Sequence, residues 1–258
     1  MLIFTRETPH AVKGKYLIII ICLVLLFGCT NDGTVTFETI SYTGEDCKTC
    51  PNVTINLPNA IGENKLEKNI NIAIREELIY LLRFDDAIET ADIPAAIKSF
   101  TQGYKNMEAL FNEERTPWEA TVTGVVSYES KEVLTLKLNS YLFTGGAHGY
   151  STTNFLNFDK QKGLALENDE LFKNEITFLN YAEEVFRRQE QIPVKDPINS
   201  TGFMFETNTY QLPENMGYTK DGFQLFYEQY EIASYADGPI VITLPYTQTN
   251  PFLVLPSK

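Results

Sequence analysis

The segment with the clearest capacity for chemistry is Thr144-Gly145-Gly146-Ala147-His148-Gly149, which combines three glycines with a histidine. Glycine adopts positive φ angles freely and lets a backbone approach a ligand closely. A histidine in such a loop could carry a proton or contact a ligand, because histidine side chains ionise near physiological pH. The same residues could instead form a tight turn that His148 braces by bonding the backbone. Residue chemistry alone favours this structural interpretation.

The sequence excludes several common kinds of active site. Its two histidines are His10 and His148, and His10 lies in a segment that we expect to be removed, so a two-histidine metal site is excluded. The sequence contains no Gly-x-Ser-x-Gly elbow, no Gly-x-x-x-x-Gly-Lys-Ser/Thr loop and no Gly-x-Gly-x-x-Gly fingerprint. Paired carboxylates for glycoside chemistry stay possible, but no pair stands out. We therefore predict no catalytic residue, no metal and no cofactor.

Cys47 and Cys50 form a C-x-x-C pair that is followed by Pro51. Outside the cytosol such a pair typically forms a disulfide. A thioredoxin-like redox site would place the pair at the start of a helix, whereas a strand-like run at residues 53–57 follows here. A zinc site would need two further ligands. We predict a structural disulfide between Cys47 and Cys50, with a redox pair as the alternative.

Residues 1–28 resemble the export signal of a bacterial lipoprotein. A basic stretch precedes an apolar run of about 12 residues, which is too short to cross a bilayer core of about 30 Å. The run ends in Leu26-Phe27-Gly28-Cys29, which resembles a lipobox. The resemblance implies cleavage before Cys29, acylation of its thiol and attachment to a membrane, with residues 29–34 as a tether. An ordinary signal peptide or an uncleaved anchor helix is the alternative, and both still export the domain.

The chain is acidic, with a net charge of −13. Removal of residues 1–28 would leave −15, because three basic residues and one acidic residue lie there. This charge argues against nucleic acid and bare anionic lipid as partners. It suits a basic protein, although acidity also simply keeps an envelope protein soluble.

Hydrophobic periodicity predicts both helices and strands. A repeat of three and four predicts amphipathic helices at residues 63–82, from Asp92 as the cap to residue 111, and at residues 175–188. Alternation predicts strands at residues 35–42, 53–57, 118–128, 133–143, 153–158, 164–166, 203–209, 222–227 and 240–244. We expect Pro58 to end the second strand, and Pro251 and Pro256 to mark a loose tail.

Separate runs of strands and helices predict an α+β fold with a mostly antiparallel sheet, about three amphipathic helices and two small subdomains. About 230 residues after the signal are enough to bury such cores. We place the first domain at residues 35–140, the second at 141–250 and the tail at 251–258.

The C-terminal half resembles domain-of-unknown-function family 3298. The residues that carry this resemblance are the loop 144–149, Asn157-Phe158-Asp159, Gly163, Leu171-Phe172, Phe226, Tyr230-Glu231-Ile232-Ala233, Tyr235-Ala236, Gly238-Pro239, Val241 and Ile242. Residues 35–140 resemble the companion family 4163, which also precedes the catalytic domain of certain peptidoglycan deacetylases. Together the two resemblances cover most of the chain after the signal.

The resemblance implies binding rather than catalysis. The same pair of domains forms the extracytoplasmic part of an anti-sigma factor that senses lysozyme by binding it. This chain shows neither a deacetylase domain nor the histidines for its metal, and only 15 residues precede the apolar run. We therefore expect neither the deacetylase reaction nor transmembrane signalling to carry over.

Our hypothesis is a non-catalytic, membrane-anchored binding lipoprotein of the cell envelope, facing the periplasm or the cell exterior. Its expected ligand is a basic wall-active protein such as lysozyme, or peptidoglycan. The predicted binding loop is Gly145, Gly146, Ala147, His148 and Gly149, and Tyr235 and Asp237 are second candidates. The alternatives are a small envelope hydrolase that uses His148 with an acid, and a purely structural envelope component.

Overall fold

The computed structural model describes residues 33–257 except residues 48, 85–89 and 112–115. The predicted signal segment, Cys29 and most of the tether lie outside the described residues. The chain divides into two units, residues 1–34 and residues 35–258. The second unit is described below. Within the described residues no helix is both long enough and apolar enough to span a membrane.

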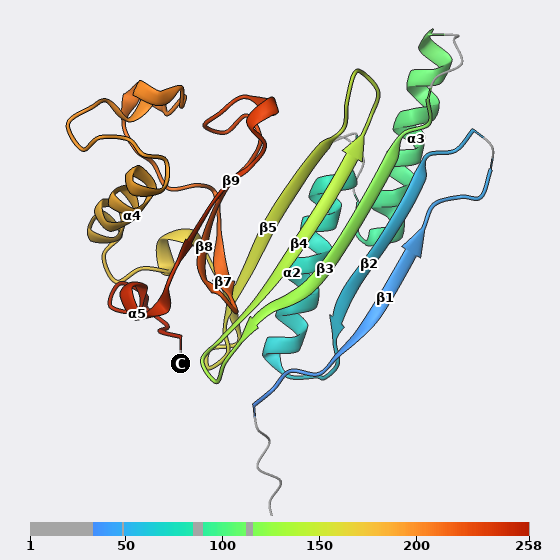
Figure 1. The fold of residues 1–258 in the computed structure, drawn as a ribbon. Coiled ribbons are helices and arrows are strands. Elements are labelled where there is room, and N and C mark those ends of the chain that lie inside the picture. Colours follow the sequence, from blue (N-terminus) through green and yellow to red (C-terminus); the bar gives the residue numbers. More distant parts are fainter. Residues whose placement is uncertain (1–32, 48, 85–89, 112–115, 258) are drawn as a thin grey trace, which may run out of the picture. The chain divides into compact units, whose positions relative to one another are not determined.

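A six-stranded sheet forms the first layer (Figure 1). Its strands follow one another in sequence order: β1 (Phe37–Thr43), β2 (Asn52–Ala60), β3 (Glu119–Glu129), β4 (Val133–Phe143), β5 (Tyr150–Asp159) and β6 (Leu164–Leu166). All neighbours are antiparallel except β2 and β3, which are parallel. A parallel pair needs a long crossover, and two helices supply it.

These two helices, α2 (Lys65–Leu82) and α3 (Ile93–Phe111), cover one face of the sheet (Figure 1). The buried side of α2 repeats every four residues, as the sequence predicts for a helix with one apolar face. Asp92 Oδ1 accepts a hydrogen bond from the Ala95 N–H at 2.8 Å, so the predicted cap of α3 is confirmed. Trp118 completes this core and packs against the rings of Phe84, Phe100 and Tyr104.

A three-stranded antiparallel sheet carries the second core. It consists of β7 (Asn215–Thr219), β8 (Gly222–Tyr227) and β9 (Ile240–Leu244), with α4 (Glu175–Gln189) and the short α5 (Tyr246–Thr249) beside it. Phe178 and Phe186 of α4 are fully buried against this sheet. Asn174 caps α4 by accepting the Thr177 N–H at 2.9 Å. The predicted α+β fold with a mostly antiparallel sheet is therefore confirmed.

β7 joins the two sheets. A Cβ atom added to Gly217 would lie 2.5 Å from the ring of Phe155 on β5, so the β7 backbone lies against this side chain where only glycine fits. Buried Asn157 accepts the Thr135 hydroxyl hydrogen and donates to the Met216 carbonyl at 2.9 Å. The Ser127 hydroxyl donates to the Tyr218 carbonyl at 2.8 Å. The two sheets therefore share a polar and tightly packed seam.

Three expectations about the elements are wrong. Residues 203–209 are not a strand, because a 3-10 turn, Glu206–Asn208, forms there with positive φ angles at Thr207 and Asn208. Pro58 does not end β2, which continues to Ala60. Pro58 lies beyond the last residue that pairs with β3, so β2 has only β1 as a hydrogen-bonding neighbour there and the strand tolerates a residue without an N–H. The tail is not loose: Leu253 is fully buried and the Val254 N–H donates to the Leu171 carbonyl.

Candidate functional site

The predicted loop 144–149 connects β4 to β5 and is exposed as far as His148. Gly145 and Gly146 adopt φ angles of 102° and 91°, which favour glycine. Gly149 is buried, and a Cβ atom there would lie 2.5 Å from the Tyr141 ring. The glycines therefore serve the tight turn and the close packing at its end.

His148 stacks on Tyr235. Their ring centroids lie 4.0 Å apart with an interplanar angle of 21°. The His148 Nδ1 atom lies 3.1 Å from the Gly149 carbonyl oxygen, and the Tyr235 hydroxyl donates to the same oxygen at 3.4 Å. The bracing contact expected of His148 is therefore present, and it leaves the imidazole on the surface.

Tyr230 extends this stack. Its ring centroid lies 5.4 Å from that of Tyr235, and its side chain is 57% exposed. Its backbone has φ = 69°, a left-handed conformation that costs a bulky residue roughly 1–2 kcal/mol. We call His148, Tyr230 and Tyr235 the aromatic shelf. Two loops far apart in sequence, 144–149 and 228–239, bring these rings together.

Asp237, the other second candidate, lies in the same turn as Tyr235 but makes different contacts. Its Oδ2 atom accepts the Ser234 N–H at 3.1 Å and the Ser234 hydroxyl hydrogen at 2.6 Å. These bonds form a capping box around the 3-10 turn Tyr235–Asp237. Asp237 thus shapes the turn that presents Tyr235, and Tyr235 is the residue that contacts the loop 144–149.

Glu228 lies beside the shelf, at the junction of the two sheets. Its Oε1 atom accepts the Thr153 N–H of β5 at 2.5 Å and lies 3.5 Å from the Asn215 amide of β7. Burial raises the pKa of Glu228 to about 7 and the Glu231 carboxylate adds to the rise, while the Thr153 N–H and Lys137 oppose it. This carboxyl group therefore changes its charge near neutral pH.

Three further ionisable groups surround Glu228. Burial raises the pKa of Glu231, whose Oε2 atom accepts the Glu228 N–H at 2.6 Å. Burial lowers the pKa of Lys137, whose Nζ atom lies 5.4 Å from the ring centroids of both Phe155 and Phe226. Burial and the two carboxylates raise the pKa of Tyr150, whose hydroxyl donates to the Gln229 carbonyl at 3.0 Å.

Sequence reasoning missed Tyr230, Glu228 and Lys137. Tyr230 belongs to the quoted pattern Tyr230-Glu231-Ile232-Ala233, so its membership was visible but its exposure was not. Glu228 and Lys137 carried no local signal, because Glu228 contacts Thr153 across 75 positions. Only the docking of the two sheets brings these side chains together.

His148 and Tyr230 of the aromatic shelf are exposed, so a ligand can reach them. Among the described contacts, His148 meets a carbonyl oxygen and an aromatic ring and no carboxylate. In the described part of the chain no three His, Cys, Asp or Glu side chains gather as metal ligands would. Exposed, stacked rings present flat apolar faces with polar edges, which suits recognition of amphipathic ligands.

The predicted disulfide between Cys47 and Cys50 is confirmed. It lies in the β1–β2 connection, where Cys47 is exposed and Cys50 is buried. Lys105 of α3 pairs with Glu45 of the same connection at 3.0 Å. The strand register places this connection at the same end of the first sheet as the loop 144–149, because Asn52 pairs with Glu119 and Glu119 pairs with Phe143.

Two family models match the chain. The model described as "Protein of unknown function (DUF3298)" matches residues 168–247, and the model described as "Deacetylase PdaC" matches residues 35–151. The first match agrees with the resemblance to family 3298 for the quoted residues from Leu171 onward. The loop 144–149 lies within the second match instead, and Asn157, Asp159 and Gly163 lie in neither match. The second covers strands β1 to β4, helices α2 and α3 and the loop 144–149.

A curated relative and two solved structures resemble the chain over most of its length. Peptidoglycan-N-acetylmuramic acid deacetylase PdaC of Bacillus subtilis (strain 168) is 20% identical over 222 residues, which are 84% of this chain and 45% of that protein. The chain therefore spans about half the length of this relative.

The two structures are DUF3298 family proteins. One from Bacteroides fragilis NCTC 9343 has a TM-score of 0.66 and 22% identity, and the match covers 88% of this chain and 96% of that one. The other, from Pseudomonas aeruginosa PAO1, has a TM-score of 0.64 and 20% identity and covers 88% and 99%. At these identities the likeness establishes the fold alone.

Proposed function

We propose that this protein is a non-catalytic binding lipoprotein of the cell envelope, anchored through Cys29, and that it binds peptidoglycan through the aromatic shelf. The observation that carries the proposal is the stack of His148 on Tyr235, with Tyr230 tilted against Tyr235. Tyr230 is held in a left-handed conformation and is 57% exposed. A strained backbone that presents an aromatic ring to solvent suggests a functional demand. Sugar rings have apolar faces that pack on such rings.

The comparisons support the envelope and the wall as the setting. The curated relative is named for action on peptidoglycan, and the PdaC model matches residues 35–151. The resemblance of residues 26–29 to a lipobox supports the anchor. The domains at residues 35–140 and 141–250, and the family-4163 character of the first, belong to the same proposal.

A basic wall-active protein such as lysozyme is the second candidate ligand, and the net charge favours it. The chain without residues 1–28 carries −15, and opposite charges speed encounter and improve complementarity. Glu228 and Glu231 beside the shelf add local negative charge to that of the whole surface whenever they are ionised.

Binding to isolated wall and to lysozyme tests the proposal. We would measure saturation binding of residues 30–258 to purified peptidoglycan and to hen lysozyme, at low salt and at 0.5 M salt (a concentration at which the Debye length is only about 4 Å). We expect peptidoglycan binding to be largely insensitive to salt, because ring stacking carries it. Lysozyme binding, if charge drives it, should weaken strongly with salt.

Variants of the shelf make this test specific. We expect the double substitution Tyr230→Ala and Tyr235→Ala to weaken peptidoglycan binding about tenfold, since two aromatic contacts of about 0.5–1.5 kcal/mol each would be lost. Tyr80→Ala on α2 is the matched control, because Tyr80 is 78% exposed and lies outside the shelf.

Each outcome separates the hypotheses. Peptidoglycan binding that the shelf variant retains would rule out the shelf as the site. Salt-sensitive binding to lysozyme alone would favour the second ligand, and binding to neither would leave the structural interpretation. A wall-degrading activity that His148→Ala abolishes with the fold intact would instead favour the enzyme.

A further inference from the structure

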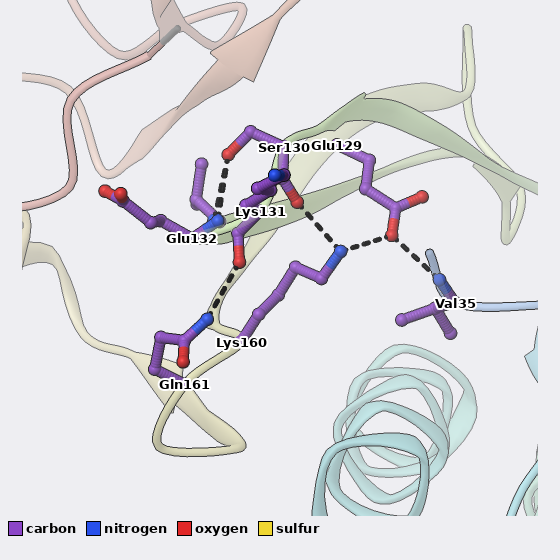
Figure 2. A network of polar contacts seen from close by, with 8 residues as sticks. Val35, Glu129, Ser130, Lys131, Glu132, Lys160 and Gln161 are labelled. Atoms are coloured by element: carbon purple, nitrogen blue, oxygen red, sulfur yellow. Dashed lines mark hydrogen bonds and ion pairs between the residues drawn. The ribbon is translucent and has the colours of Figure 1, made fainter. Parts of the chain in front are cut away.

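A buried ion pair lies at the point where the folded chain begins (Figure 2). Lys160 Nζ lies 2.6 Å from Glu129 Oε1 and donates to the Ser130 carbonyl at 2.8 Å. The two side chains are only 5% and 18% exposed. The other cation of this turn, Lys162, pairs with Asp159 at 3.3 Å but is 66% exposed.

The same carboxylate holds the first residue after the tether. The Val35 N–H donates to Glu129 Oε1 at 2.8 Å (Figure 2). The Val35 side chain is buried in the first core, and the Ile61 N–H donates to the Thr36 carbonyl at 2.8 Å. We call Val35, Glu129 and Lys160 the N-terminal clamp. It fixes the direction of the chain two residues before β1 begins.

The clamp and the aromatic shelf lie at opposite ends of β4. Glu129 and Ser130 precede β4, whereas the loop 144–149 follows it (Figure 1). The 11 residues of β4 extend over about 35 Å at about 3.4 Å per residue. The shelf is therefore held far from the residue at which the folded unit is attached to the tether.

The surface around the clamp carries several exposed lysines and exposed apolar side chains. The β5–β6 turn contacts the start of α2, because Gly163 lies against Leu66 and its carbonyl accepts the Asn69 amide at 2.6 Å. Exposed lysines and two exposed apolar residues gather on these connected segments: Lys65, Lys68, Lys131, Lys162, Ile61 and Leu164. Lys68 and Lys162 are paired with Glu63 and Asp159, so both signs of charge are present.

We propose that this end of the domain is its membrane-proximal face, seated on phospholipid headgroups, and that the N-terminal clamp keeps the aromatic shelf directed away from the bilayer. The inference rests on the lipid anchor of the proposed function. Five residues lie between Cys29 and Val35, and a fully extended chain reaches at most about 20 Å from one to the other. The covalent anchor, and not the net charge, keeps this face near the membrane.

Energy transfer from the protein to labelled lipid tests the orientation. The full lipidated chain would be placed in vesicles of phosphatidylethanolamine and phosphatidylglycerol with an acceptor dye on a minor lipid. A donor would be attached through Gln161→Cys at the clamp end or Ala147→Cys in the loop 144–149, both of which are exposed positions. We expect several-fold higher transfer efficiency from position 161 than from position 147.

Clamp variants test the role of the ion pair. The double substitution Glu129→Met and Lys160→Met removes both charges together, so neither is left buried without a partner. We expect it to reduce the difference in transfer efficiency between positions 161 and 147, because release of Val35 and Thr36 would lengthen the tether by two residues. Lys105→Met is the matched control, because it breaks an ion pair with Glu45 outside this face, and it should leave the difference unchanged. Glu129→Gln is the substitute if the double variant folds poorly. It removes the negative charge but keeps an acceptor for the Val35 N–H, so we expect it to reduce the difference in transfer efficiency by a smaller amount.

Vesicle association distinguishes failure of the anchor from failure of the orientation. Protein that does not associate with vesicles would overturn the lipid anchor and the face assignment with it. Equal transfer from both positions in fully associated protein would overturn the orientation alone. If the folded double variant showed the same difference in transfer efficiency between the two positions as the wild type, the role of the clamp would be overturned.

Discussion

At the scale of single residues, Asn157, Asp159 and Gly163 serve the fold, and all three lie before the residues 168–247 that match the DUF3298 model. Asn157 joins the two sheets, and Asp159 Oδ1 accepts the N–H groups of Gln161 and Lys162 in the β5–β6 turn. Gly163 packs on α2 with φ = 67°. The shelf residues differ from these. Their rings reach the surface, and their contacts with one another would be kept when a ligand binds.

Glu228 makes the stability of the protein depend on pH. The folded state raises the pKa of Glu228 from 4.5 to about 7, so the folded protein binds this proton more tightly than the unfolded chain. This contribution to stability is full below the unfolded pKa and is lost as the pH rises through about 7.

We therefore expect the free energy of unfolding of the wild-type protein to fall by about 1 kcal/mol between pH 5 and pH 8, relative to that of Glu228→Gln. This value allows for the solvent that reaches a half-buried carboxyl group. Urea denaturation of both proteins at the two pH values measures this difference. A gain of stability with pH relative to the variant would contradict the direction of the shift.

At the scale of elements, the position of β7 decides how the small sheet meets the large one. Gly217 approaches the Phe155 ring so closely that an added Cβ atom would lie 2.5 Å from it. Because β7 and β8 pair in register, a shift of Gly217 also moves Phe226 and Glu228 relative to β5. The site therefore depends on this one close approach.

We expect Gly217→Ala to destabilise the protein by about 1–3 kcal/mol, since overpacking of a tight contact costs that much. Ser151→Ala, at an exposed position of β5, should change the stability by less than about 0.5 kcal/mol. Thermal and urea unfolding measure both. Equal stability of Gly217→Ala and the wild-type protein would show that β7 can move without cost.

At the scale of the whole molecule, two hydrophobic cores lie within one compact unit, residues 35–258. Polar bonds across the seam, from Asn157 to Met216 and from Ser127 to Tyr218, connect them. Unfolding of either core would break these bonds, which couples the unfolding of one core to that of the other. The two cores should therefore not unfold separately, even though the sequence suggests two domains.

The single tryptophan makes this expectation testable. Trp118 lies in the first core, so its fluorescence follows that core, whereas far-ultraviolet circular dichroism follows both. We expect the two urea transitions to coincide. A fluorescence transition clearly separated from the circular dichroism transition would show that the cores are independent.

The sequence by itself determined the α+β class, the three long helices and most strands, because hydrophobic period and helix caps are local properties. It also indicated the Cys47–Cys50 disulfide, and it placed His148 and Tyr235 among the candidates. It failed at residues 203–209, where apolar residues lie in a turn, and at β7, where Gly217 interrupts any alternation. Only the tertiary structure decided that Tyr230 joins the shelf, that Glu228 lies between the sheets and that Glu129 holds Val35. Each of these facts depends on contacts between segments far apart in sequence, which local patterns do not encode.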